Sequence, residues 1–250
     1  MRSRSRRSRI RRSFSPSPED PRAVRRLARW HIWLGWLVAV PLLLWTLSGL
    51  VMVSRPIEEV RGEHLRAEGR SEILPAGEPL TLVVPAAAGP VAEATVRVQH
   101  GQTVVLLRPP HGPAQRYRLD GAPLPGIDEA AARAIAAQGI RGGREIVSAR
   151  LFPADSAPLD FRRPMPAWQV RFSDGTRVYV GEQTGAIEAI RTRFWRVFDI
   201  MWGLHIMDLR GREATHHPVL IVFAALAFVA VLVGTALLFR RRARSESARP

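Results

Sequence analysis

The amino-acid sequence predicts an α+β domain enclosed between two transmembrane α-helices. Two uncharged apolar runs, residues 32–53 and 219–239, are long enough to cross a bilayer core, which takes about 20 helical residues. Between these runs, short segments alternate apolar and polar residues and are separated by turn signals such as Asp-Gly. One alanine-rich segment among them has the spacing of a helix. Short connections between the strands indicate an antiparallel sheet with a helix packed on it.

The distribution of charge separates two explanations of a strongly basic chain. The net charge of the 250 residues is +15, and all 37 basic residues are arginines. Such an excess is typical of proteins that bind nucleic acid or an anionic membrane. Here residues 1–29 carry a net +9 and residues 240–250 a net +4, which leaves only +2 for everything between them. The balanced middle argues against a nucleic-acid partner, and the basic ends favour a lipid bilayer.

Residues 1–29 are predicted to be a basic disordered tail, because arginine, serine and proline dominate there. The first transmembrane helix is predicted over residues 30–53. Trp30, Trp33 and Trp36 cluster at its beginning, where indole rings favour the membrane interface.

The second transmembrane helix is predicted over residues 218–239, and a second basic tail follows it over residues 240–250. Arginines therefore precede the first span and follow the second span. The positive-inside rule then places both termini in the cytoplasm and the segment between the spans on the other side of the membrane. The sequence predicts a bacterial inner-membrane protein with a periplasmic or extracytoplasmic central domain.

The first part of that domain, residues 54–126, is predicted to be a stalk followed by a β-rich half. Prolines and glycines are frequent at its start. Strands are predicted over residues 80–84, 94–100, 103–107 and 115–119. Gly101-Gln102 lies between the second and third of these strands as a hairpin signal.

The second part, residues 127–191, is predicted to be a helix followed by four strands. The helix covers residues 127–138, with Asp128 as its N-cap and Gly139 as its C-cap. Its predicted apolar stripe consists of Ile127, Ala131, Ala134 and Ile135. The strands are predicted over residues 145–152, 168–172, 177–180 and 186–190, with a strong turn signal at Asp174-Gly175.

Residues 194–209 are predicted to form an amphipathic helix just before the second span. The apolar spacing of i, i+3, i+4 and i+7 is typical of a helix that lies in a membrane interface. The predicted stripe consists of Phe194, Val197, Phe198, Met201, Trp202, His205 and Leu209. The alternative is that this stripe packs beneath the extracytoplasmic domain.

The stretch WQVRFSDGTRVYVGEQTGAIEAI, preceded by the alanine-rich helix, resembles the PepSY domain over residues 127–191. Its position between two spans is similar to that in PepSY-associated transmembrane proteins. The Trp30-His31 and Leu204-His205 pairs match two further features of that family, although its larger members have about four spans. The earlier stretch VVLLRPPHGPAQRYRLDGAPL parallels the later one and indicates a degenerate PepSY-like repeat.

Histidine is the remaining strong ligand type, because the chain has no cysteine. Four histidines flank the spans, and the resemblance makes them candidate ligands of haem b. They are His31, His205, His216 and His217.

A haem held by two histidines needs both imidazoles on one iron. A span of 22 residues is about 33 Å long, so His31 would need a second subunit of a homodimer or a partner protein. His205 could instead pair with His216 or His217 at the outer end. The alternatives are histidines that hydrogen-bond headgroups or backbone, and a copper or zinc site of His205 and His217 with Asp208 or Glu213.

No motif of a hydrolase, a nucleotide-binding protein or a metalloprotease is present. The sequence therefore predicts a protein that is not an enzyme on its own. The resemblance implies an accessory subunit of a membrane redox or iron and metal-uptake system, acting by protein contact and by haem-mediated electron transfer. The alternatives are a membrane-anchored regulator or inhibitor of an extracytoplasmic peptidase, and a haem-dependent membrane reductase in its own right.

Overall fold

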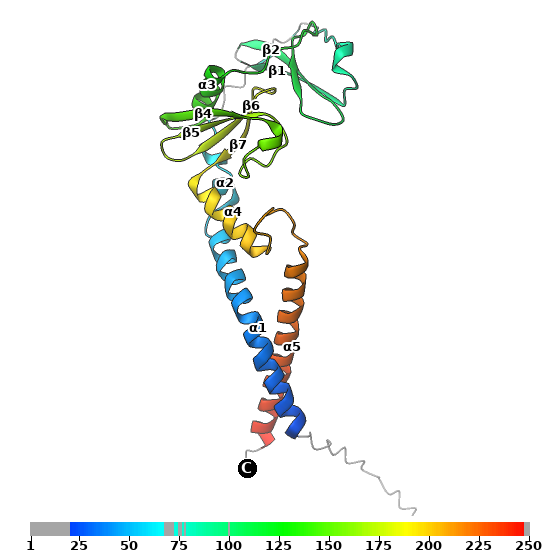
Figure 1. Cartoon of the computed structure of the whole chain (residues 1–250), viewed down its shortest axis with the longest axis vertical. Coiled ribbons are helices and arrows are strands. Elements are labelled where there is room, and N and C mark those ends of the chain that lie inside the picture. The colour runs from blue at the N-terminus through cyan, green and yellow to red at the C-terminus, as the bar shows by residue number, and fades with distance from the viewer. Residues whose placement is uncertain (1–20, 68–72, 75–76, 78, 100, 248–250) are drawn as a thin grey trace, which may run out of the picture. The chain divides into compact units, whose positions relative to one another are not determined.

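The computed structural model describes residues 21–67, 73–74, 77, 79–99 and 101–247. Residues 1–20 of the predicted tail lie outside the described residues. The chain divides into two compact units (Figure 1). One unit combines Met1–Thr46 with Ala214–Pro250, and the other is Leu47–Glu213.

The first unit contains most of helix α1 (Pro21–Val53) and helix α5 (Pro218–Ser247), which lie side by side. Two segments of these helices, Val24–Val53 and Pro218–Arg242, are long and apolar enough to cross a membrane. Their large apolar side chains are mostly exposed, as expected of helices that face lipid.

Helix α1 begins earlier than the sequence indicated, because residues 21–29 of the predicted tail are helical. Proline is favoured as a first helical residue, and the arginines, alanines and leucine that follow are good helix formers. Helix α5 likewise continues into the second predicted tail as far as Ser247.

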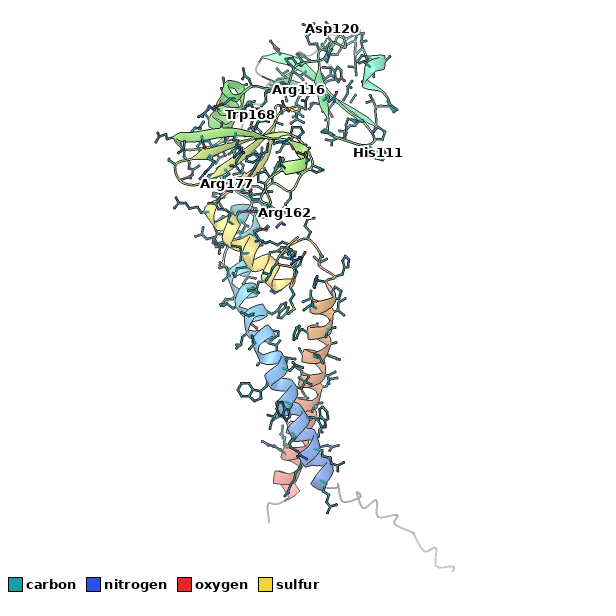
Figure 2. The ribbon with its side chains drawn as sticks, viewed as in Figure 1. His111, Arg116, Asp120, Arg162, Trp168 and Arg177 are labelled. Atoms are coloured by element: carbon teal, nitrogen blue, oxygen red, sulfur yellow. The ribbon has the colours of Figure 1, made fainter. Side chains whose placement is uncertain are left out.

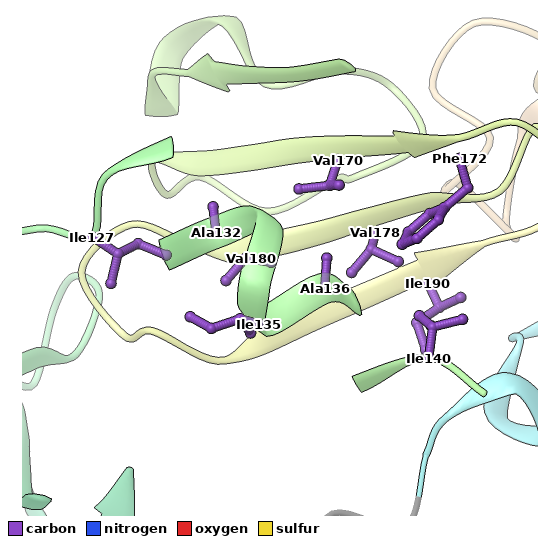
Figure 3. Packing of buried hydrophobic residues seen from close by; sticks show 10 residues of the cluster. All are labelled: Ile127, Ala132, Ile135, Ala136, Ile140, Val170, Phe172, Val178, Val180 and Ile190. Carbon is purple, nitrogen blue, oxygen red and sulfur yellow. The ribbon is translucent and has the colours of Figure 1, made fainter. Parts of the chain in front are cut away.

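The second unit contains a four-stranded antiparallel sheet in which each strand pairs with its neighbour in sequence (Figure 1). Its strands are β4 (Ile146–Phe152), β5 (Ala167–Phe172), β6 (Arg177–Gly181) and β7 (Ile187–Arg191). Helix α3 (Glu129–Gly139) covers one face, and Figure 3 shows the apolar side chains that fill the space between them. A smaller cluster covers the other face and is formed by Phe161, Met165, Ala167, Tyr179 and Ala189. The predicted helix on an antiparallel sheet is confirmed.

The caps of α3 show one correct and one wrong prediction. Asp128 is the N-cap, and its Oδ1 accepts a hydrogen bond of 2.8 Å from the Ala131 backbone N–H. Gly139 is not a C-cap but the last helical residue, and Ile140 follows it in an extended conformation. A Cβ at position 139 would overlap Ile187, so this glycine allows the helix to approach β7 closely.

The buried face of α3 also differs from the predicted stripe. Ala134 is exposed, whereas Ala132, Ile135 and Ala136 are buried. Alanines occur on every side of this helix, so periodicity alone could not select the face that packs on the sheet.

A second, three-stranded antiparallel sheet precedes α3. Its strands are β1 (Glu93–Gln99), β2 (Gln102–Arg108) and β3 (Gln115–Tyr117), in that order. An isolated bridge between Tyr117 and Pro123 continues the same up-and-down order beyond β3. The meander of the second half thus recurs, but a single 3-10 turn, η2 (Ala86–Ala88), stands directly before β1 in place of a helix.

The strand predicted over residues 80–84 is not formed. This segment is extended, and the Val83 backbone N–H donates to the Leu119 carbonyl at 3.0 Å without a ladder. One such bond does not make a strand, because a strand requires repeated pairing with a neighbour.

The beginning of the predicted stalk is packed against the second half of the domain. It contains α2 (Ile57–Val60) and the 3-10 helix η1 (Glu63–Leu65). Val60 is fully buried, and Arg66 forms a bridge with Ile140. Gly62 has a φ of 73°, and a Cβ there would lie 2.7 Å from Ile190 Cγ2. The chain that leaves α1 is therefore part of the domain rather than a free spacer.

Candidate functional site

Helix α4 (Arg193–His205) connects β7 to the segment before α5, and its buried face differs from the predicted one. Thr192 caps it by accepting a hydrogen bond from the Trp195 backbone N–H at 3.0 Å. Trp195, Asp199 and Gly203 are buried, whereas Val197 of the predicted stripe is 46% exposed. The helix therefore packs on the domain with a face that contains a carboxylate, and it leaves part of its apolar stripe uncovered.

Asp199 is held by two arginines from different parts of the chain. Its Oδ1 accepts from Arg162 Nη2, and its Oδ2 accepts from Arg212 Nη1, both at 2.5 Å. Only 6% of the Asp199 side chain is exposed. Charge-assisted bonds to both oxygens compensate for the cost of burying this carboxylate.

Both of these arginines have a left-handed backbone, with φ of 57° at Arg162 and 56° at Arg212. This conformation is uncommon for residues other than glycine and costs on the order of 1–3 kcal/mol each. Trp202 Nε1 and Arg162 Nη1 also donate to the Arg212 carbonyl, at 3.0 and 3.2 Å. The bonds to Asp199 and to this carbonyl hold both loops in place beside α4, and Figure 2 shows Arg162 next to that helix.

A second buried carboxylate, Asp160, lies against the four-stranded sheet. It accepts from the Tyr179 hydroxyl at 2.5 Å and from Arg177 Nη1 at 2.9 Å. Gln169 donates to the Tyr179 oxygen, and the Phe161 ring stacks on the Tyr179 ring with centroids 4.6 Å apart. Burial, followed by the bond to Asp160, raises the pKa of Tyr179 well above its usual value of about 10.

A groove of about 310 Å³ runs between these two carboxylates. Arg177 and Arg212 line it, and α4 contributes Trp195, Arg196 and Ile200. Arg196 Nη2 donates to the Gly175 carbonyl at 3.2 Å. Its Nη1 atom is buried and has no hydrogen-bond partner within the described part of the chain. Desolvation, and then the charge of Arg177, lowers the pKa of Arg196.

The C-terminal end of α4 contacts the end of α1 that belongs to the same unit. His205 Nδ1 lies 3.0 Å from Ser48 Oγ, and Ser48 is fully buried. Gly49 stands next to it, and a Cβ there would lie 3.3 Å from His205 Cε1. The imidazole of His205 therefore packs against two small residues of α1.

The other candidate histidines lie in the first unit. His31 packs against Gly234 of α5, where a Cβ would lie 2.8 Å from its Cε1 atom. His216 and His217 directly precede α5, and the His217 carbonyl accepts from the Ile221 N–H at 3.2 Å. The ring Nδ1 atoms of His31 and His217 are buried without a partner among the described residues.

Neither unit by itself fits a haem held by two of the four candidates. Within the first unit, the contact at Gly234 lies 17 residues from His217 in sequence, about 25 Å of helix. His216 and His217 are consecutive, so they cannot place imidazoles on opposite faces of one ring. In the second unit, His205 is the single candidate, and Ser48 already contacts its Nδ1.

In the described part of the chain, no three His, Asp or Glu side chains gather where they could hold a metal ion. Asp208, which was considered for copper or zinc, instead accepts from the backbone N–H groups of Gly211 and Glu213. Its carboxylate thus stabilises the turn that follows α4.

Comparison with known families identifies the class of the protein. The family model described as the PepSY-associated TM region matches residues 2–242. The chain therefore belongs to the PepSY-associated transmembrane family, and its two apolar helices make it a membrane protein in contact with a lipid bilayer. No curated protein and no solved structure matches it.

Neither the pairing of Asp199 with Arg162 and Arg212 nor the groove was predicted from the sequence. The two arginines lie 37 and 13 residues from Asp199, so no local spacing joins them. One signal was available, because Trp195, Asp199 and Gly203 follow each other at intervals of four residues.

Proposed function

We propose that this protein is an accessory subunit of a membrane redox or metal-uptake system and that it acts by protein contact. The observation that carries the proposal is the outer edge of the four-stranded sheet. In the described part of the chain, β4 pairs only with β5, and its other edge is open. An open edge presents backbone donors and acceptors to which a strand of another protein can add.

Side chains on β4 support this role. Val147 is 62% and Leu151 37% exposed, which is unusual for two large apolar residues on one short edge strand. The ladder is shifted between Ile146 and Ser148, so Val147 is displaced from regular pairing. A partner strand would cover both apolar side chains and complete the hydrogen bonds of the edge.

The attachment of the sheet to α1 supports the same function. Asp199 joins α4 to two loops of the domain, and Ser48 joins α4 to the last turns of α1. A conformational change caused by binding at the sheet would therefore be transmitted to the end of the first span through packed side chains and hydrogen bonds.

Placement in the bacterial inner membrane with both termini in the cytoplasm is part of the proposal and rests on the arginines that flank the spans. A periplasmic reporter enzyme fused after Pro250 should be inactive, whereas the same enzyme inserted after Asp120 should be active. An active fusion at Pro250 would reverse the proposed orientation.

A haem-borne electron path would need histidines from both units or a ligand from a second chain, because neither unit by itself brings two candidate histidines together. The visible spectrum of the full chain, purified in mild detergent from haem-replete cells, tests this path. We expect no Soret band. A band that His31→Ala or His205→Ala weakens would show that the chain itself carries haem.

The contact proposal is tested by a charge on the open edge. Val147→Lys should release the protein from its native membrane complex, because an edge lysine opposes the addition of a strand. Blue-native electrophoresis of solubilised native membranes measures this. Val84→Lys, at a residue of similar exposure outside the sheet edge, is the matched control. A complex of unchanged size in Val147→Lys membranes would contradict the proposal.

A further inference from the structure

The groove beside α4 has a chemical character that protein contact at β4 does not explain. Its polar lining consists of two aspartates and three arginines, and its apolar lining includes Leu159 and Ile200: the polar residues are Asp160, Arg177, Arg196, Asp199 and Arg212. Both carboxylates already accept hydrogen bonds. Asp160 accepts from Tyr179 and Arg177, and Asp199 accepts from its two arginines.

The arginines of the groove exceed the charge of these carboxylates. Arg171, Arg177 and Arg193 all lie close enough to Arg196 to disfavour its charge, and Asp160 alone among its interacting groups favours it. Arg196 Nη1 is buried without a partner in the part of the chain that the structure describes. A buried guanidinium N–H without an acceptor costs free energy, so an anion that bonded to it would be stabilised.

The rim of the groove is apolar and exposed. Leu159 is 69% and Ile200 48% exposed. The end of α4 reaches Ser48, which belongs to the candidate span Val24–Val53. The groove is therefore built on a helix whose end contacts the last turns of the first candidate span.

We propose that this groove binds the headgroup of an anionic phospholipid, with the phosphate at Arg196 and Arg177 and the acyl region against Ile200 and Leu159. Arginine binds phosphate oxygens with two parallel hydrogen bonds, which suits a site with several guanidinium groups. A free phosphate ion would satisfy the same donors but would leave the exposed apolar rim uncovered. The rim thus favours lipid over the free ion as the source of the phosphate.

The test uses the purified full chain in dodecyl maltoside micelles. Phosphatidylglycerol is added in increasing amounts, phosphatidylcholine serves as the zwitterionic arm, and inorganic phosphate serves as the free-ion arm. Thermal unfolding reports the lipid fraction that gives half of the maximal stabilisation. The basic tails are the same in every variant, so any lipid that they attract cancels in the comparison between matched variants, which isolates the groove.

Two matched pairs of variants are compared. Ile200→Glu places a negative charge in the groove without removing a hydrogen bond, and Val197→Glu makes the same change one turn away outside its lining. Arg196→Gln removes the unpaired guanidinium, and Arg118→Gln removes an exposed arginine of the other sheet. We expect Ile200→Glu and Arg196→Gln each to need about tenfold more phosphatidylglycerol than their controls.

Equal lipid requirements within both pairs would overturn the proposal. Stabilisation by millimolar inorganic phosphate that equals the effect of phosphatidylglycerol would also overturn it, because the site would then hold a free ion. Should Arg196→Gln fail to fold, the pair at positions 200 and 197 decides the question alone, since both of those side chains are about half exposed.

Discussion

His205 Nδ1 and Ser48 Oγ lie 3.0 Å apart, which joins the last residue of α4 to the last turns of α1. The contact is possible because Gly49 has no side chain, and a Cβ there would lie 3.3 Å from the imidazole. A histidine that the sequence offered as a candidate haem ligand thus takes part in the packing of two helices. The junction connects the unit that contains the four-stranded sheet to the last turns of the first span.

Ser48→Ala removes the hydroxyl from this contact. We expect the free energy of unfolding to fall by about 1 kcal/mol, the usual net value of one partly buried hydrogen bond. Thermal unfolding of the full chain in detergent measures it. Ser54→Ala is the control, because Ser54 is exposed and its hydroxyl donates to the nearby Val51 carbonyl. An equal loss in both variants would mean that the Ser48 contact has no particular weight.

Asp199→Asn removes the charge that both arginines share. Breaking a buried ion pair on one side typically costs about 3–5 kcal/mol, and the partial exposure of the two arginines reduces this to about 2–3 kcal/mol. Asp120→Asn is the matched control, because Asp120 and its partner Arg118 are both more than half exposed. Chemical unfolding in detergent gives both values. The importance assigned to Asp199 would be refuted by a loss no greater than that of the control.

Gly234→Ala introduces a methyl group where His31 packs. A Cβ there would lie 2.8 Å from His31 Cε1, so the imidazole or the helices must shift, and we expect a loss of about 1–3 kcal/mol. Gly35→Ala is the control, since no atom lies within 4 Å of its added Cβ. In the double variant His31→Ala with Gly234→Ala the extra loss should disappear. If the extra loss persisted in the double variant, His31 would not be the residue that the new methyl group contacts.

The raised pKa of Tyr179 predicts that the free energy of unfolding falls at alkaline pH. Its pKa is raised in the folded protein by burial and by the bond to Asp160, so the folded state binds the phenolic proton more tightly than the unfolded state does. This stabilisation is complete below the unfolded pKa of about 10 and is lost as the pH rises above it. Chemical unfolding between pH 8 and 11 measures the effect, and Tyr179→Phe lacks this component. An unchanged pH profile in Tyr179→Phe would contradict it.

The elements of the domain could be predicted because their signals are local. Strand alternation and turn signals such as those at Gly101 and Gly175 predicted the seven strands of the described residues to within one or two residues, and Asp128 marked the start of α3. The two spans followed from length and composition in the same way. Such features depend on neighbours in sequence, so they are visible without a structure.

The contacts that organise the candidate site are not local. The face of α4 was predicted from its apolar stripe, which treats Asp199 as an outward residue, whereas two distant arginines make its burial favourable. The segment at residues 80–84, where a strand was expected, has suitable side chains but forms no ladder with a neighbouring strand of the described residues. The histidines at the span ends suggested ligands, but the positions of Gly49 and Gly234 show where their rings pack.

The most direct test of the contact function is a photo-crosslinking amino acid at Val147 in the full chain, expressed in its native membrane, with the same group at Val84 as control. We predict that position 147, and not position 84, gives a crosslinked product, and that mass spectrometry identifies its second component as a membrane redox or transport protein. A crosslink from Val147 to a peptidase would favour the regulatory alternative and contradict the proposal. Equal products from both positions, or none from Val147, would show that the β4 edge is not the contact surface.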